Sequence, residues 1–355
     1  MPATSSPLCL LRLSALGDVT HVVPLVRTLQ QGLPGTPLHW VIDKAGHKLL
    51  DGLPGVSFHI YEKKSGVAGL FTGLAGMYRL RKGMPAEGFE ALLQMQVAFR
   101  ANVLSAFIPA PRRIGYDRSR SKDLHGLFIN ERIPDRPGIH VLDAIGSFCE
   151  PLGLKQTEVS WDLATPADAH AWAAAQWQDD GRPVLMISPC SSHQRRNWYA
   201  ERYAALADHA AAQGWRVVLC GGRSDLERST TDAILAAMQH PALDLVGKDT
   251  LKQLPALLAR ANLLVTPDSG PMHIANAVGT KVLGLHAASN PARSGPYSDR
   301  RYCVDRYDAA ARRYLHKPAS ALKWGTKIEF DEVMSLITVE DAIAAFERYR
   351  SDHGH

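Results

Sequence analysis

Short apolar runs alternate with amphipathic segments along most of the chain, a pattern typical of a parallel sheet whose strands are joined by helices. In the first half, we expect strands at 8–13, 38–42, 56–60, 91–94 and 113–115. Helices are expected around 21–31, 67–81, 99–107 and 140–151. This alternation predicts an α/β layer system.

The second half repeats the pattern in kind, although no residue-level repeat is visible. Strands are expected at 184–187, 216–220, 243–246, 263–266 and 281–285. Helices are expected near 169–178, 200–213, 226–238, 251–261, 272–278, 331–337 and 339–349. We therefore predict two doubly wound domains, 1–165 and 180–330, with the helices of 331–355 packing back across the joint. Such domains would face a central cleft at the carboxyl ends of their strands, where open α/β sheets bind ligands.

Composition excludes several classes of protein. The 355 residues are 46% hydrophobic and 21% charged, which is ordinary for a folded soluble protein. No apolar run approaches the ~20 residues of a membrane span, and the first residues do not resemble a signal peptide, so we expect a cytoplasmic protein. The five scattered cysteines include no C-x-x-C pair, which favours reduced thiols over a zinc site.

The basic residues are unevenly distributed. The net charge is only +5, too small for a dedicated nucleic-acid binder, and we expect no nucleic-acid partner. Between Arg79 and Lys122, however, nine Lys or Arg stand against three acidic residues, a local charge of +6. Arg118, Arg120 and Lys122 follow the predicted strand 113–115 and are candidates for binding an anionic partner. A solvated basic surface is the alternative.

The first candidate for chemistry is Asp18, in the turn Ser14-Ala-Leu-Gly-Asp18 after the opening strand. A carboxylate at this place can act as a general base, or it can simply cap the following helix. Only Gly17 is present where a dinucleotide-binding loop would carry G-x-G-x-x-G, so a nicotinamide dehydrogenase is poorly supported.

A second group of polar residues lies at 188–198, directly after the first strand of the second domain. The hydroxyls of Ser191 and Ser192 and the guanidinium of Arg196 are suited to binding phosphate oxygens. A plain surface loop is one alternative. A Cys190/His193 nucleophile pair is another, but no orienting carboxylate is near in sequence.

Two further groups follow strands of the second domain. Glu227, after the glycines of Cys220-Gly-Gly, either accepts hydrogen bonds from ribose hydroxyls or complements a helix dipole. Asp268, Ser269 and Gly270 form a turn at the head of a helix, an arrangement suited to anions, and His273 lies in the first helical turn. No second ligand stands at metal-binding spacing, so no metal site is expected.

These motifs, taken in order, resemble the ADP-heptose:lipopolysaccharide heptosyltransferases, glycosyltransferase family nine. The resemblance spans nearly the whole chain, and its most specific parts are the opening x-Gly-Asp turn and the Asp-Ser-Gly-x-x-His block. It implies a GT-B fold of two Rossmann-like domains, the first for a lipid-linked acceptor and the second for a nucleotide sugar. The implied activity is inverting transfer of heptose from ADP-heptose to the inner core of lipopolysaccharide, on a Kdo-lipid A type acceptor.

The resemblance also implies roles for residues. Asp18 matches the family's general base, and Arg196 matches a basic residue on the donor phosphates. Ser191 and Ser192 match phosphate-binding hydroxyls, Glu227 a ribose contact, and Asp268, Ser269, Gly270 and His273 the diphosphate site. No cofactor and no metal are expected, since cations and helix N–H groups can stabilise the leaving ADP. The implied partners are the ADP-sugar, an anionic lipid-linked saccharide and, through that lipid, the inner face of the cytoplasmic membrane.

Two departures from the family pattern affect the donor. Asn290 stands where the family usually has an acid, in the segment His286-Ala-Ala-Ser-Asn-Pro291, and a basic stretch at 301–317 looks like an insertion. A family member that uses another nucleotide hexose is therefore one alternative function. A non-catalytic nucleotide-sugar-binding protein is another.

Overall fold

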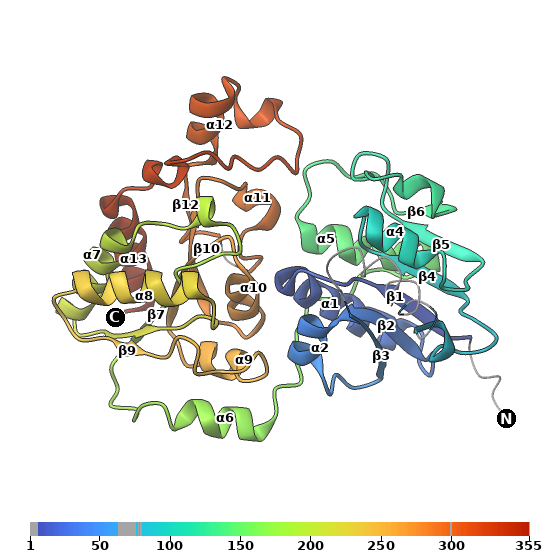
Figure 1. Cartoon of the computed structure of the whole chain (residues 1–355), viewed down its shortest axis with the longest axis horizontal. Helices are drawn as coiled ribbons and strands as arrows, with labels where there is room; N and C mark the ends of the chain where they lie inside the picture. The colour runs from blue at the N-terminus through green and yellow to red at the C-terminus, as the bar shows by residue number, and fades with distance from the viewer. Residues whose placement is uncertain (1–5, 63–75, 77, 79, 299, 355) are drawn as a thin grey trace. The chain divides into compact units, whose positions relative to one another are not determined.

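The computed structural model describes residues 6–62, 76, 78, 80–298 and 300–354. The chain divides into two compact units, Met1–Ala164 and Thr165–His355. Each unit is built on one parallel six-stranded sheet, and Figure 1 labels most of the helices and strands of both. We describe each unit by itself.

The first sheet has the strand order β3-β2-β1-β4-β5-β6. Its strands are β1 (Leu8–Leu11), β2 (Leu38–Asp43), β3 (Val56–Tyr61), β4 (Ala91–Gln94), β5 (Arg112–Gly115) and β6 (Glu131–Arg132). The unit also contains the helices α1 (Leu16–Gly32), α2 (Lys44–Leu50), α4 (Phe99–Ser105) and α5 (Val141–Gly146) and the 3₁₀ turns η1 (His125–Leu127) and η2 (Ser147–Leu152). Helix α1 packs against α5, which places its first turn beside the carboxyl end of β1.

The second sheet has the order β12-β11-β10-β7-β8-β9, which is the order of the first sheet read from the other edge. Its strands are β7 (Val184–Ile187), β8 (Arg216–Leu219), β9 (Leu243–Asp244), β10 (Leu263–Pro267), β11 (Lys281–His286) and β12 (Val304–Asp305). Its α-helices are α6 (Ala167–Ala174), α7 (Ala200–Ala212), α8 (Asp225–Ala237), α9 (Leu254–Leu258), α10 (Gly270–Ala277), α11 (Pro291–Ser294), α12 (Tyr307–Leu315) and α13 (Val339–His353). Short 3₁₀ turns complete the unit: η3 (Gln194–Arg196), η4 (Ala319–Ala321) and η5 (Val333–Leu336).

Both sheets reverse their strand order at one place, between β1 and β4 in the first unit and between β7 and β10 in the second. In doubly wound sheets, ligands bind beyond the carboxyl ends of the strands at this switch point, because the helices on its two sides lie on opposite faces. The segments that follow these four strands contain Asp18, Arg196 and Asp268. The predicted α/β doubly wound fold is therefore confirmed in each unit. Of the other candidate residues, Glu227 follows β8, and Arg118, Arg120 and Lys122 follow β5, so they lie beside the switch points and not at them.

Several elements differ from the predicted ones. The sequence indicated neither the two-residue edge strands β6 and β12 nor α2, and the basic stretch at 301–317 contains the helix α12. The helix predicted at 331–337 is only the 3₁₀ turn η5, and the helix predicted at 67–81 lies mostly outside the described residues. Helix α13 packs on α7, β11 and β12, and its Phe346 and Tyr349 belong to the apolar core of the second unit.

Among the described residues, no helix is long and apolar enough to cross a membrane.

Candidate active site

The first candidate site lies at the carboxyl end of β1, where Asp18 occupies the first turn of α1. Its carboxylate accepts a hydrogen bond from the Ala15 backbone N–H at 3.3 Å and forms an ion pair with Arg12. The side chain remains 30% exposed, so one carboxylate can cap the helix and still be reached from outside. The geometry contains the helix-capping contact expected of one alternative, and the general-base role stays a prediction.

Arg12 is a residue that the sequence analysis did not single out. It follows β1 directly, and its guanidinium also donates to the Met95 carbonyl after β4. Burial lowers the pKa of Arg12, but the charges of Asp18 and Tyr116 outweigh burial, so the pKa rises above its ordinary value. Arg12 is therefore a permanent cation that holds the Asp18 carboxylate in one place. A basic residue that directly follows the apolar run Leu8–Leu11 was a signal that could have been noticed.

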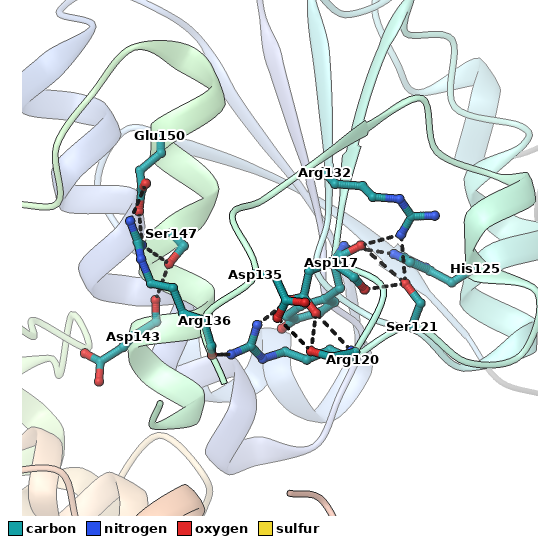
Figure 2. Close-up of polar contacts among 12 residues, drawn as sticks. Asp117, Arg120, Ser121, His125, Arg132, Asp135, Arg136, Asp143, Ser147 and Glu150 are labelled. Carbon is teal, nitrogen blue, oxygen red and sulfur yellow. Dashed lines mark hydrogen bonds and ion pairs between the residues drawn. The ribbon is translucent and has the colours of Figure 1, made fainter. Parts of the chain in front are cut away.

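The second candidate region of the first unit is the loop after β5, drawn in Figure 2. Asp117 is buried there and accepts hydrogen bonds from Ser119 Oγ at 2.5 Å and from the Arg120 backbone N–H at 3.0 Å. The Arg120 guanidinium pairs with the same carboxylate and also donates to the Arg136 carbonyl. Burial raises the pKa of Asp117, but the hydrogen bonds from Ser119 and Arg120 lower it by more than burial raises it. The pKa therefore lies below its ordinary value, and the carboxylate is charged.

His125 and Arg136 hold the residues that follow Asp117 and Arg120 in the sequence. His125 is buried, and its Nε2 accepts the Tyr116 N–H at 3.1 Å while its Nδ1 lies 2.8 Å from Asn102 Oδ1. Burial and the nearby Arg132 lower the pKa of His125 to about 4. Arg136, in turn, is held by Glu150 and Ser147, as Figure 2 shows.

The predicted acceptor-binding residues therefore divide into two kinds. Arg120 is committed to internal bonds, whereas Arg118 and Lys122 are exposed. Two other basic residues of the +6 segment also serve the fold, since Arg112 pairs with Glu131 at 2.8 Å and Arg113 donates to three carbonyl oxygens. Much of the local positive charge is thus structural, which the sequence count could not distinguish.

In the second unit, the loop after β7 folds around Ser191. The Ser191 N–H donates to Asn197 Oδ1 at 2.7 Å, and its hydroxyl donates to the His193 carbonyl at 3.0 Å. Ser191 is buried by these contacts, whereas Ser192 is exposed. Cys190 is 6% exposed and burial raises the pKa of its thiol, which disfavours the nucleophile alternative.

Glu227 lies in the first turn of α8, where Ser224 is the N-cap. Its carboxylate accepts the Gly222 N–H at 2.7 Å and the Ser224 hydroxyl at 2.8 Å, so the capping role is present in the geometry. Asp249 was missed by the sequence analysis: burial raises its pKa to about 6, and the charge of Glu227 adds to the rise. Two acidic groups therefore lie near the glycine turn that follows β8.

The turn after β10 carries the Asp-Ser-Gly-x-x-His block. Ser269 is the N-cap of α10, but its hydroxyl lies 2.8 Å from Thr266 Oγ1 and makes no capping hydrogen bond to the helix N–H groups. Asp268 is almost fully buried and pairs with Lys327, and His273 Nε2 lies 3.9 Å from its other oxygen. Burial raises the pKa of Asp268, but Lys327, His286 and His273 lower it well below its ordinary range.

Lys327 and Glu329 are the main site residues that the sequence analysis missed. Glu329 pairs with Arg196, whose Nε lies 2.6 Å from Glu329 Oε1. Both residues come from the loop between η4 and η5, which has no periodic pattern, so no sequence signal linked them to residues more than fifty positions away. Asn290 caps α11 by accepting the Ala292 N–H at 2.9 Å, which accounts for its presence without a ligand. No group of three His, Cys, Asp or Glu suited to a metal occurs within the described residues.

With this geometry established, comparison with known proteins gives a consistent result. Residues 77–324 match the model of glycosyltransferase family 9 (heptosyltransferase). The chain is 38% identical to the lipopolysaccharide core heptosyltransferase OpsX of Haemophilus influenzae over 96% of each protein. It is 24% identical to lipopolysaccharide heptosyltransferase 3 of Escherichia coli K12 over 94% of each.

Solved structures agree on the fold. A family 9 glycosyltransferase from Veillonella parvula superposes with a TM-score of 0.78 at 22% identity, over 99% of both chains. Escherichia coli ADP-heptose LPS heptosyltransferase II gives 0.73 at 18% identity, over 98% of this chain and 100% of the other. The heptosyltransferase WaaC, solved with ADP, gives 0.72 at 17% identity, over 97% and 99%. These likenesses identify the fold as GT-B, and the family match and the 38% identity show that the chain belongs to glycosyltransferase family 9, the heptosyltransferases.

Proposed function

We propose that this enzyme transfers a heptose from ADP-heptose to the inner core of lipopolysaccharide, on a Kdo-lipid A type acceptor, with inversion at the anomeric carbon. The observation that carries the proposal is the 38% identity, along nearly the whole chain, to a lipopolysaccharide core heptosyltransferase. The site residues of the two units supply the chemical groups that such a transfer needs.

Asp18 is proposed as the general base. An acceptor hydroxyl is far too weak an acid to lose its proton unaided, so a carboxylate must take the proton as the oxygen attacks the anomeric carbon. The Arg12 ion pair orients the carboxylate, and its 30% exposure leaves the side chain within reach of a substrate.

The donor is proposed to bind at the carboxyl edge of the second sheet. ADP accumulates negative charge on its β-phosphate as it leaves, and preformed donors stabilise that charge without reorganising. We assign this role to Arg196 and to the N–H groups at the start of α10, and we assign the ribose contact to Glu227 and Asp249, which lie near the glycine turn after β8. Since cations and helix N–H groups suffice here, we propose that the reaction needs no metal ion.

The acceptor is proposed to meet the first unit at Arg118 and Lys122, whose charges are exposed. Kdo carboxylates and lipid phosphates would be their partners. Because this acceptor is anchored in lipid, we propose that the enzyme works at the cytoplasmic face of the inner membrane as a peripheral protein.

The direct test is turnover of purified protein with a Kdo-lipid A acceptor and a panel of donors: ADP-heptose, ADP-glucose and UDP-glucose. We expect a product one heptose heavier by mass spectrometry, formed from ADP-heptose, also in the presence of EDTA, and absent with Asp18→Asn. Turnover of a hexose donor in preference to ADP-heptose would contradict the donor assignment. A strict Mg²⁺ requirement would contradict the metal-free mechanism.

A further inference from the structure

A short segment beyond the matched family region supplies two charged side chains to the donor half of the molecule. Ile328 is fully buried and its N–H donates to the Ala288 carbonyl at 2.9 Å, which fixes the segment against the loop after β11. Lys327 and Glu329 flank this anchor, and each reaches a residue of a conspicuous sequence motif. Lys327 pairs with Asp268, and Glu329 pairs with Arg196.

The neighbourhood of Lys327 is rich in positive charge. Burial lowers the pKa of the Lys327 ammonium, Asp268 raises it, and Arg196 and Arg293 lower it again. The Arg293 side chain is also adjacent to the same segment, because a Cβ on Gly325 would lie 3.8 Å from its Nε. Among the described residues, Arg293 has no ion-pair partner. Three cations are therefore close together, with two carboxylates to balance them.

The ammonium of Lys327 is not saturated by Asp268. An ammonium group has three N–H donors, and its hydrogen bond to Asp268 Oδ2 uses one of them. The side chain is 27% exposed, against 10% for Asp268, so the cation rather than the carboxylate faces outward. Asp268 immediately precedes Ser269, the N-cap of α10, so Lys327 is tied to the residue next to the helix N-terminus.

We propose that Lys327 binds the diphosphate of the nucleotide-sugar donor beside Arg196, and that Asp268 holds its ammonium in position. The inference rests on the proposed function, because it assumes a nucleoside diphosphate donor. It adds a residue from outside the matched region and gives Asp268 a task distinct from ligand contact. The Asp268 carboxylate alone would repel a phosphate. Because it pairs with Lys327, whose side chain is the more exposed of the two, the group nearest to a bound phosphate is the ammonium.

The test is calorimetric titration of ADP and of AMP into the full-length protein. We expect Lys327→Met to weaken ADP binding ~10- to 100-fold, the range for losing a hydrogen bond to a charged group, and AMP binding less than ~3-fold. Lys327→Arg keeps the charge and should retain ADP affinity within ~5-fold. Lys317→Met is the matched control, because Lys317 is an exposed lysine of the same unit, and it should bind both nucleotides as the wild type does.

The outcomes separate the inference from the proposed function. Wild-type protein that binds no ADP would contradict the proposed function itself. Wild-type protein that binds ADP, with Lys327→Met binding it equally well or losing ADP and AMP by the same factor, would overturn only the role of Lys327. Should Lys327→Met fail to fold by circular dichroism, Lys327→Gln decides, because its amide keeps a hydrogen bond to Asp268 and removes only the charge.

Discussion

The two units use the same element, an aspartate at the carboxyl edge of a sheet paired with a cation, in opposite ways. In the first unit Asp18 lies one turn into a helix and is 30% exposed, while its partner Arg12 is the more buried of the two at 13%. In the second unit Asp268 is the buried partner at 10%, and Lys327 is the more exposed at 27%. One pair presents its carboxylate to the surroundings and the other presents its cation.

The difference indicates which atom of each pair is available for chemistry. An accessible carboxylate held by a buried guanidinium can receive a proton. An accessible ammonium held by a buried carboxylate can bind an anion. Identical strand orders therefore yield one site suited to proton transfer and one suited to phosphate, and relative burial within the pair distinguishes them.

The largest effect should come from exchanging each aspartate for asparagine. Asp18→Asn should lower kcat by ~10²–10⁴ and leave ADP affinity unchanged, because the general base proposed here acts only as the acceptor proton leaves. Asp268→Asn should instead weaken ADP binding and lower the melting temperature, since it leaves a partly buried Lys327 without its counter-charge. Steady-state kinetics with calorimetry distinguishes the two, and an Asp18→Asn enzyme with more than a tenth of the activity would return Asp18 to helix capping alone.

A smaller effect, of opposite signs, is expected at the Arg196–Glu329 pair. Arg196→Ala should weaken ADP binding ~10- to 100-fold and AMP binding less, because the variant removes the charged donor that we propose for the β-phosphate. Glu329→Gln removes the competing carboxylate, so ADP affinity should stay the same or rise a few-fold. Both are measured by calorimetric titration; equal losses of ADP and AMP in Arg196→Ala would move Arg196 away from the β-phosphate.

In the first unit, the loop after β5 allows exposed basic residues to be compared with an internally paired one. Arg118→Gln with Lys122→Gln should raise the acceptor KM ~3- to 10-fold and reduce its salt dependence, because screened surface contacts are individually weak. Arg120→Gln should lower the melting temperature, since it leaves the buried Asp117 carboxylate without its guanidinium. Unchanged acceptor kinetics at low salt in the double variant would mean that these exposed charges only solubilise the protein.

A last comparison concerns acid stability and takes one fully buried histidine from each unit, His125 and His286. Burial lowers the pKa of both His125 and His286 to about 4, below the ordinary 6.5. Between pH 6.5 and 4 the unfolded chain binds protons that the folded units do not. The free energy of unfolding therefore decreases as the pH is lowered through this range, by about 1.4 kcal/mol per pH unit for each histidine.

In His125→Gln and in His286→Gln, the melting temperature should decrease less between pH 6.5 and pH 4 than in the wild type. The effects of the two substitutions should add in the double variant. Asp117 and Asp268, whose pKa values are lowered, lose their contribution only at more acidic pH. A wild-type protein whose melting temperature is constant from pH 6.5 to 4 would contradict the buried neutral histidines.

Sequence patterns predicted most of the fold, because both sheets rest on central strands with continuous apolar runs. Three of these central strands are buried along their whole length: Leu8–Leu11, Val184–Ile187 and Leu263–Pro267. A strand buried on both faces forms a continuous apolar run in the sequence, which is easily distinguished from a surface segment. The edge strands β6 and β12 were missed because two residues make no pattern. Helix α12 was missed because the stretch at 301–317 was interpreted from its charge as an insertion, although Tyr307–Leu315 has only two basic residues in nine.

The candidate sites were predictable only in part. Asp18, Arg196 and Asp268 lie in the segments that follow strands, so topology alone brings them to the carboxyl edge of a sheet. Glu329 and Lys327, the partners of Arg196 and Asp268, are distant in sequence and come from a segment without a repeat, and only tertiary structure brings them together. The same holds for Met95, whose carbonyl accepts from Arg12, the partner of Asp18. Arg120 illustrates the opposite error, in which the sequence suggested a ligand contact and the structure shows an internal ion pair with Asp117. A count of charges along the sequence cannot distinguish an exposed arginine from an internally paired one.

The anchoring of Lys327 and Glu329 late in the chain has a genetic consequence. A frameshift or stop codon near residue 322 would leave intact the Gly-Asp turn, the serine loop and the Asp-Ser-Gly-x-x-His block, the motifs in which the chain resembles its family. It would remove both partner charges together with Ile328, Phe346 and Tyr349 from the core of the second unit. A genome survey that scores these motifs alone would therefore count such an allele as functional, although its product would lack the partners of Asp268 and Arg196.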